Sequence, residues 1–158
     1  MAKRSAGIVM YRRAERGVEL LLVHFGGPMW AKKNDGAWSF PKGEIEADED
    51  ALTAARREFE EELGAAVDGD FVALEPVKQK GGKVIELFAV AGDLDVGAIR
   101  GNTFTMEWPP RSGRRAEFPE VDRAAWFGLE EARRKLLPSL LPVLDYVPIR
   151  MFAPPGAQ

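Results

Sequence analysis

Cysteine is absent from this sequence of 158 residues, and histidine occurs only once. The lack of cysteine excludes disulfide bonds, thiol catalysis and cysteine-ligated zinc sites. It is also typical of a protein that works in a reducing compartment. We therefore expect a cytoplasmic protein whose chemistry depends on side chains other than thiols.

Long hydrophobic runs and a basic surplus are missing too. The most apolar run, Leu20–Val23, is far too short to span a membrane. The charged start, Met1–Arg4, is not followed by a segment with the apolar length of a signal peptide. The 22 Lys and Arg residues stand against 25 Asp and Glu residues, which makes the net charge −3. These absences argue against a membrane partner and against nucleic acid as the main partner.

The composition is that of an ordinary globular domain, with 46% hydrophobic and 30% charged residues. A chain of this length forms a single hydrophobic core. We therefore expect one domain over residues 1–150 and a C-terminal tail over residues 151–158. The oligomeric state stays open.

Apolar runs and turn residues predict a mixed α/β fold. Runs rich in Val, Ile and Leu at residues 7–11 and 18–24 predict two strands joined by a polar turn. Residues 47–63 predict the principal helix, with Asp48 as N-cap, acidic residues in the first turn and Gly64 at the C-terminal end. Further strands are expected at 38–40, 71–79, 83–91, 103–108 and 124–127, and further helices at 129–137 and up to residue 146. Strands before and after a central helix imply a mixed sheet covered by helices.

The predicted central helix carries an acidic arc. At 3.6 residues per turn its core side is a stripe of apolar residues, Leu52, Ala55, Phe59 and Leu63. A neighbouring arc carries Glu58, Glu61 and Glu62, which are spaced so that they repel one another. The arginines at 56 and 57 fall at other angles, so the arc lacks an obvious basic partner. Two interpretations stay open: a solvated acidic surface, or a site for a hard divalent cation such as Mg²⁺.

The segment Gly43–Ala65 resembles the complete Nudix box. That family's pattern is a glycine, five residues, a glutamate, seven residues and then R-E-U-x-E-E-x-G-U, where U is bulky and apolar. Every fixed position is matched, by Gly43, Glu49, Arg57, Glu58, Glu61, Glu62 and Gly64. Seven fixed residues at about 6% each, over all the possible start points in the chain, make a chance match on the order of one in a million. Only Ala65 departs, being small for the last apolar place. The resemblance implies a Nudix α/β/α sandwich with a mixed β-sheet between helices.

The same resemblance implies a reaction and a set of roles. Members of the family use Mg²⁺, or Mn²⁺, to split X-linked nucleoside diphosphates by attack of water on phosphorus. The implied metal ligands are the Gly43 carbonyl, Glu58, Glu61 and Glu62. Glu49 and Arg57 would form an orienting ion pair. Glu61 is the favoured general base and Glu120 the second choice, since a base must reach the water rather than be fully committed to metal.

Outside the box, the sequence resembles the pyrophosphohydrolase branch that includes diadenosine polyphosphate hydrolases. Trp38–Gly43 is similar to the W-x-x-P-K-G segment of that branch, which implies that Lys42 reaches a substrate phosphate. The alternative is a solvated loop lysine. Glu120 stands six residues before Trp126, at an offset where many members carry an extra ligand or general base. Glu117 is its nearby competitor for that role.

Other residues give weaker indications. Arg111 and Arg114 lie in the Pro/Gly-rich stretch 108–118 and could clamp phosphates through bidentate hydrogen bonds. A solvated basic loop is an equal alternative. His24 is expected to be structural, because no serine or cysteine nucleophile signature surrounds it.

Three functions follow from these patterns. The leading hypothesis is a Mg²⁺-dependent hydrolase that cleaves a diphosphate bond of a small-molecule nucleotide, either a nucleoside triphosphate or a dinucleoside polyphosphate. An RNA 5′-end pyrophosphohydrolase is an alternative, against which the negative net charge counts. A non-catalytic Nudix module that senses a ligand is another, against which the intact glutamates count. The box recognises only the diphosphate and its metals, so it leaves the rest of the substrate open.

Overall fold

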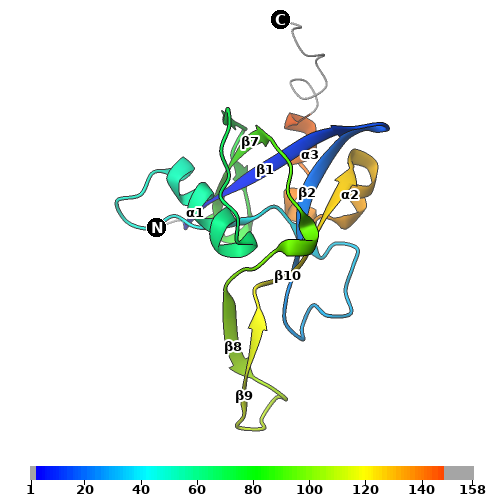
Figure 1. Cartoon of the computed structure of the whole chain (residues 1–158). Helices are drawn as coiled ribbons and strands as arrows, with labels where there is room; N and C mark the ends of the chain where they lie inside the picture. The colour runs from blue at the N-terminus through cyan, green and yellow to red at the C-terminus, as the bar shows by residue number, and fades with distance from the viewer. Residues whose placement is uncertain (1–2, 148–158) are drawn as a thin grey trace, which may run out of the picture.

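The computed structural model describes residues 3–147 of the chain (Figure 1). The strands are β1 (Arg4–Ala14), β2 (Gly17–Phe25), β3 (Trp38–Ser39), β4 (Lys42–Glu44), β5 (Val72–Ala73), β6 (Val77–Lys78), β7 (Val84–Ala91), β8 (Thr103–Glu107), β9 (Arg115–Pro119) and β10 (Val121–Gly128). The helices are α1 (Ala51–Leu63), α2 (Leu129–Lys135) and α3 (Val143–Tyr146), with 3-10 turns η1 (Lys80–Gly82), η2 (Val96–Ala98) and η3 (Pro138–Leu140).

Most strands belong to one mixed sheet. Its main path runs β10-β2-β1-β7-β5, with β3 paired to β2, β4 to β1 and β6 to β7. β1 and β7 are parallel, with Ile8 opposite Phe88, and the other pairs of this sheet are antiparallel. β8 and β9 form a separate hairpin that projects from the body (Figure 1).

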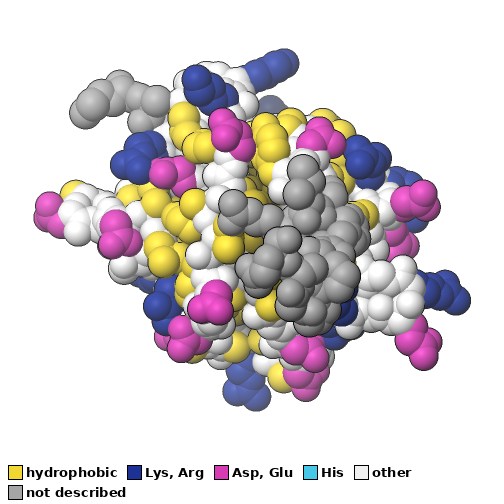
Figure 2. Space-filling model, turned by 90° about the horizontal axis from the view of Figure 1, so that it is seen from above, with side chains coloured by type: hydrophobic (Ala, Val, Ile, Leu, Met, Phe, Trp, Pro, Cys, Tyr) yellow, Lys and Arg dark blue, Asp and Glu magenta, His cyan; other side chains and the backbone are white. Residues whose placement is uncertain are grey.

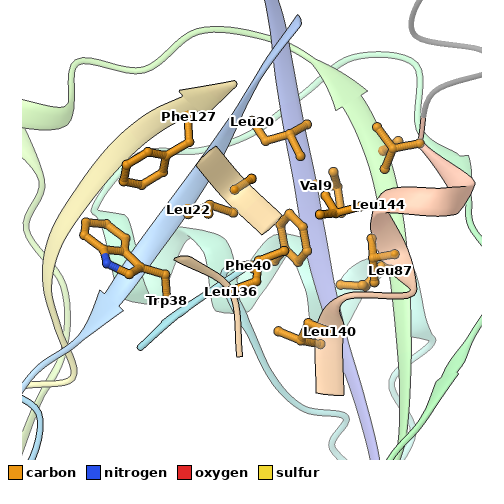
Figure 3. Close-up of a cluster of buried hydrophobic side chains, with 14 of the residues drawn as sticks. Val9, Leu20, Leu22, Trp38, Phe40, Leu87, Phe127, Leu136, Leu140 and Leu144 are labelled. Atoms are coloured by element: carbon orange, nitrogen blue, oxygen red, sulfur yellow. The ribbon is translucent and has the colours of Figure 1, made fainter. Parts of the chain in front are cut away.

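Alternation along β1 sends its side chains to two hydrophobic clusters on opposite faces of the sheet. Ile8 and Met10 belong to the cluster that includes Phe59 of α1. Val9 belongs to the other cluster, part of which is shown in Figure 3. That second cluster joins sheet residues to the C-terminal helical segments, and it includes Leu20, Leu22, Trp38, Phe40, Leu87, Phe127, Leu136, Leu140 and Leu144. The predicted α/β/α sandwich with a mixed sheet between helices is confirmed.

Helix α1 is shorter than predicted and begins at a different cap. Asp50 is the N-cap, because its carboxylate accepts the N–H of Thr53 at 2.7 Å. Asp48 instead has a left-handed φ of 68° in the connection before the helix, and the first turn of α1 contains no acidic residue. The chain must turn back from β4 before the helix starts, so the expected acidic residues lie in that connection. Gly64 ends the helix as predicted, with φ of 76° and its N–H donating to the Glu60 carbonyl at 2.8 Å.

Other boundaries differ from the predicted ones for identifiable reasons. The strand expected at 71–79 is divided into β5 and β6, with Pro76, which lacks an N–H donor, between them. β9 lies within the Pro/Gly-rich stretch that had favoured a loop, and it exists because it pairs with β8. The helix expected at 129–137 ends at Lys135, before Pro138. The expected tail, 151–158, lies outside the described residues.

Charges are well mixed on the face seen in Figure 2, where acidic and basic side chains alternate around hydrophobic atoms. None of the helices within residues 3–147 has the length and apolar composition needed to cross a bilayer.

Candidate active site

The acidic arc of α1 lies next to β4. The buried residues of the helix are Ala54, Ala55, Phe59 and Leu63, whereas Leu52, expected in the core, is only half-buried. Burying that stripe against the sheet leaves Glu58, Glu61 and Glu62 half-buried beside it. The three box glutamates are therefore held by a helix whose other side is fixed in the core.

Gly43 of β4 lies directly against the Glu58 carboxylate. A Cβ atom at position 43 would be 2.0 Å from Glu58 Cδ and 2.2 and 2.4 Å from its two oxygens. Ordinary contacts between carbon atoms are about 3.5–4.0 Å, so a side chain here would have to displace the Glu58 carboxylate. Glycine at this position lets the β4 backbone and the carboxylate meet.

Glu62 carries a strongly perturbed carboxyl group. It accepts the backbone N–H of Lys42 at 3.0 Å, which ties α1 to β4. Burial raises the pKa of Glu62 to about 8, and the charges of Glu58 and Glu120 add to the effect. Burial also raises the pKa of Glu58 above its ordinary value. Both carboxyl groups thus hold a proton more readily than an exposed glutamate does, and perturbed pKa values of this kind are common at functional sites.

Arg57 connects the acids of the box. Its Nε and Nη2 donate to the two oxygens of Glu49 at 2.8 and 3.0 Å. Its Nη1 donates to Glu58 at 2.9 Å and to Glu61 at 3.1 Å. The hydrogen bonds from Arg57 hold the pKa of Glu49 below its ordinary range. The expectation that no arginine partners the acidic arc was wrong, because Arg57 and Glu61 are four residues apart and share a face of the helix.

Glu120 approaches the same glutamates from a distant part of the chain. It stands between β9 and β10, and its negative charge is among the causes of the raised pKa values of Glu58 and Glu62. Glu117, its competitor, is an exposed residue of β9 that lies opposite Thr105 in the hairpin. The structure thus brings Glu120 toward the box, while its role stays a prediction.

Residues 100–102, which the sequence analysis did not single out, lie between Glu120 and the end of α1. The N–H of Arg100 donates to the Leu63 carbonyl at 3.1 Å, and the N–H of Asn102 donates to the Glu61 carbonyl at 2.8 Å. Residues 100–102 thereby cover the C-terminal end of α1. No motif marks this segment, and its one signal in the sequence is the glycine at 101.

Lys42 is half-buried beside the acids. Burial lowers its pKa and the charge of Lys83 lowers it further, while Glu62 and Glu58 oppose the change. Within residues 3–147, its ammonium forms no ion pair. The Lys42 ammonium is therefore available to pair with an incoming anion, which the prediction of phosphate binding requires.

Arg111 and Arg114 lie between β8 and β9, at the tip of the hairpin. The tip is shaped by Glu107, whose carboxylate accepts the N–H groups of Arg111 and Gly113 at 3.0 and 3.2 Å. Four residue steps of β8 separate the tip from the base of the hairpin, or about 13 Å at the rise of a strand. The structure therefore does not bring these arginines to the glutamates.

His24 is fully buried. Its Nδ1 lies 2.8 Å from Asp122 Oδ1 and its Nε2 lies 2.6 Å from the Lys33 carbonyl oxygen. Both ring nitrogens are occupied by internal hydrogen bonds, as a structural histidine requires.

The donor set of this region suits a hard divalent cation. It offers carboxylate and carbonyl oxygens with no sulfur and no imidazole. In the described part of the chain, no three acidic or histidine side chains already converge as a cation site. Arg57 holds Glu58 and Glu61, so a cation would compete with its guanidinium for them. Burial and the charges of Glu58 and Glu120 disfavour the charged form of Glu62 and so raise its pKa, and a bound cation would stabilise that form.

The NUDIX domain family matches residues 1–147 of the chain. The chain belongs to the Nudix family. Membership confirms the resemblance carried by the box, and it supports the predicted enzyme class, a Nudix pyrophosphohydrolase. A comparison with curated proteins gave no match.

Solved structures show the same fold. An Ap4A hydrolase of C. elegans, in a binary complex, has a TM-score of 0.61 at 21% identity, covering 89% of this chain and 92% of that one. The NUDIX domain of Shewanella oneidensis NrtR, complexed with ADP ribose, has a TM-score of 0.64 at 14% identity, covering 95% and 88%. A MutT protein from Methanosarcina mazei Go1 has a TM-score of 0.55 at 18% identity, covering 91% and 92%.

Proposed function

We propose that this Nudix domain hydrolyses a diphosphate bond of a nucleoside polyphosphate, either a nucleoside triphosphate or a dinucleoside polyphosphate. The observation that carries the proposal is the placement of two box glutamates against β4: Gly43 leaves space there for the Glu58 carboxylate, and Glu62 accepts the Lys42 N–H at 3.0 Å. Buried like charges destabilise a fold unless something offsets them. The similar folds of an Ap4A hydrolase and a MutT protein support a nucleotide as the substrate.

Mg²⁺ is the proposed cofactor, with Mn²⁺ as a substitute. The Gly43 carbonyl, Glu58, Glu61 and Glu62 would hold it, since all four supply the oxygen ligands that these cations prefer. When bound, the cation neutralises charge on the phosphate oxygens and lowers the pKa of the attacking water. Glu49 keeps Arg57 in place through two hydrogen bonds, and Arg57 in turn orients Glu58 and Glu61.

The proton of the attacking water requires a carboxylate that is free to accept it. Glu61 already accepts a hydrogen bond from Arg57 at 3.1 Å, so its carboxylate is partly committed to that contact. Glu120 has no such partner in the described part of the chain. We therefore assign the general base to Glu120, the second choice of the sequence analysis, and a ligand role to Glu61.

The cationic residues would bind the rest of the substrate. Lys42, half-buried beside the acids, would neutralise a phosphate next to the cleaved bond. Arg111 and Arg114 lie at the hairpin tip and would contact only a substrate that extends along the hairpin, as the second half of a dinucleoside polyphosphate does. The proposed substrate remains a small-molecule nucleotide, since the net charge is −3. The proposed compartment remains the cytoplasm, since cysteine is absent.

A substrate panel tests the proposal. Nucleoside triphosphates, dinucleoside polyphosphates, ADP-ribose and 5′-triphosphorylated RNA would each be incubated with the protein in Mg²⁺, Mn²⁺ or EDTA, and the products separated by chromatography. Carrying out the reaction in ¹⁸O-labelled water shows by mass spectrometry which phosphorus is attacked. We expect cation-dependent release of a nucleotide from the small polyphosphates.

Two variants make the test specific to the site. Glu62→Gln should lower turnover by about 10²-fold or more, as loss of a metal ligand does. Glu60→Gln removes an exposed charge of the same helix outside the cluster, and it should behave like wild type. Turnover of RNA alone would favour the 5′-end alternative, and binding of a nucleotide without turnover would favour the non-catalytic module.

A further inference from the structure

Glu120 has no side-chain anchor of its own. The residue is exposed, and its carboxylate forms no hydrogen bond or ion pair with any residue between 3 and 147. Its place relative to α1 therefore depends on the backbone on either side of it. The contacts of that backbone become as important to the reaction as the carboxylate itself.

On one side, the backbone of Glu120 is linked to α1. Its N–H donates to the Asn102 carbonyl at 3.0 Å, and the Asn102 N–H donates to the Glu61 carbonyl at 2.8 Å. The Arg100 N–H donates to the Leu63 carbonyl at 3.1 Å. These are carbonyls at the end of the helix, which lack partners within the helix. One short segment thus joins the backbone of Glu120 to the helix that carries the box glutamates.

That link requires a glycine at position 101. A Cβ atom there would lie 2.0 Å from the Glu62 carbonyl oxygen and 3.0 Å from the Glu61 carbonyl oxygen. Both atoms belong to the helix backbone, which cannot move aside as a flexible side chain can. Any larger residue at 101 would push the segment, and Glu120 with it, away from α1.

On the other side, the backbone of Glu120 is linked to the end of β2. The N–H of the buried residue Gly26 donates to the Glu120 carbonyl at 2.9 Å. A Cβ atom at position 26 would lie 1.8 Å from the Pro119 carbonyl oxygen. Neither Gly26 nor Gly101 has a left-handed φ, so space is what demands glycine at both positions.

We infer that Gly26 and Gly101 are positioning residues for the reaction: by admitting backbone contact on both sides of Glu120, they hold its carboxylate opposite Glu58 and Glu62. The hairpin β8–β9 leaves the body at this junction (Figure 1). This inference rests on the proposed function, and specifically on the general-base role of Glu120.

Two substitutions displace Glu120 from opposite sides. Gly101→Ala and Gly26→Ala should each lower kcat by about 10- to 100-fold, since misplacing a catalytic group by 1 Å can cost 10²-fold. KM for a nucleoside triphosphate should change little, because Lys42 lies on β4, outside the displaced segment. Gly97→Ala is the matched control: it lies in the same connection, and its Cβ would meet only the Asp95 carboxylate, at 3.3 Å. Its kcat should equal that of wild type.

The decisive measurement combines each alanine with Glu120→Gln. If the glycines act through Glu120, adding either alanine to Glu120→Gln causes no further loss of kcat. Losses that multiply would overturn the inference, since the glycines would then affect some other part of the site. Urea unfolding and circular dichroism identify the variants that fold. One alanine variant that folds is enough to test the inference. If neither variant folds, the two glycines are needed for the fold itself, and the positioning inference is overturned.

The proposed function can be judged separately. If Glu120→Gln alone keeps the kcat of wild type, the base assignment fails and the positioning inference fails with it. Cation-dependent turnover by the wild-type protein would still uphold the hydrolase. If Glu120→Gln is impaired but the two alanine variants are not, the base assignment stands and only the positioning inference is overturned.

Discussion

Substituting alanine for Gly43 perturbs the site by one methyl group. The methyl carbon would lie 2.0 Å from Glu58 Cδ, whereas ordinary contacts between carbon atoms are about 3.5–4.0 Å. Because Gly43 does not have a left-handed φ, its backbone accepts alanine and only the carboxylate has to move. The side chain of Glu58 must therefore withdraw from β4 by about 1.5 Å or more.

The expected loss follows from that displacement. Misplacing a catalytic or binding group by about 1 Å can cost 10²-fold in rate, so Gly43→Ala should lower kcat/KM by about 10²-fold or more. Overpacking of this kind costs typically about 1–3 kcal/mol of stability, which leaves an ordinary domain folded. Activity should thus be lost well before the fold.

Steady-state kinetics with Mg²⁺ and urea unfolding in EDTA measure the two quantities. Gly128→Ala is the control, because its φ is −65° and nothing lies within 4 Å of its Cβ position. Glu58→Asp shortens the acid and makes room for the methyl group, so adding Gly43→Ala to Glu58→Asp should cause little further loss. Wild-type activity of Gly43→Ala, or losses that multiply in the double variant, would refute the steric reasoning.

Four further predictions concern single side chains. Glu62→Gln should weaken Mg²⁺ binding by about tenfold or more; equal affinities in a calorimetric titration would contradict its ligand role. Glu61→Gln should destabilise the metal-free protein by about 0.3 kcal/mol, because it removes an i,i+4 ion pair that the sequence-based argument from repulsion did not foresee. Urea midpoints in EDTA measure this, and a higher midpoint for the variant would mean that repulsion outweighs the pair. Lys42→Ala should raise KM more than it lowers kcat. If KM and kcat are both unchanged, Lys42 is a solvated loop lysine instead. Glu120→Gln should lower kcat by roughly 10²–10⁴ with little change in KM, whereas Glu117→Gln should resemble wild type. The opposite ranking in kcat would mean that the wrong loop glutamate was chosen.

Local sequence patterns were sufficient for the parts of the fold that local physics determines. The apolar runs at 7–11 and 18–24 predicted β1 and β2, because a strand buried on both faces is apolar throughout. The end of α1 was predicted at Gly64 because a left-handed C-cap is nearly a glycine signature. The box was recognised by its resemblance to the family pattern, whereas helical spacing alone placed Glu58, Glu61 and Glu62 on one side of the helix.

Other features depend on contacts that the local pattern does not reveal. β9 is a strand because β8 pairs with it, and the residues of 115–119 give little indication of this by themselves. Arg57 was placed by its angle on the helix, yet the length of its side chain decides which acids it contacts. The approach of Glu120 was anticipated from the resemblance, while its physical cause lies in hydrogen bonds to Asn102 and Gly26, far away in sequence.

The contacts of Arg57 divide the acidic residues of the box into two kinds. Glu58 and Glu61 are paired with its guanidinium before any ligand arrives, so their charges are partly compensated in the metal-free protein. Glu62 lies outside this network, and its pKa of about 8 reflects burial without a cationic partner of comparable strength. A bound cation would have to compete with Arg57 for the first two carboxylates but not for Glu62. The free-energy penalty of ionising a buried acid is therefore largest at Glu62, and a cation bound there would offset it.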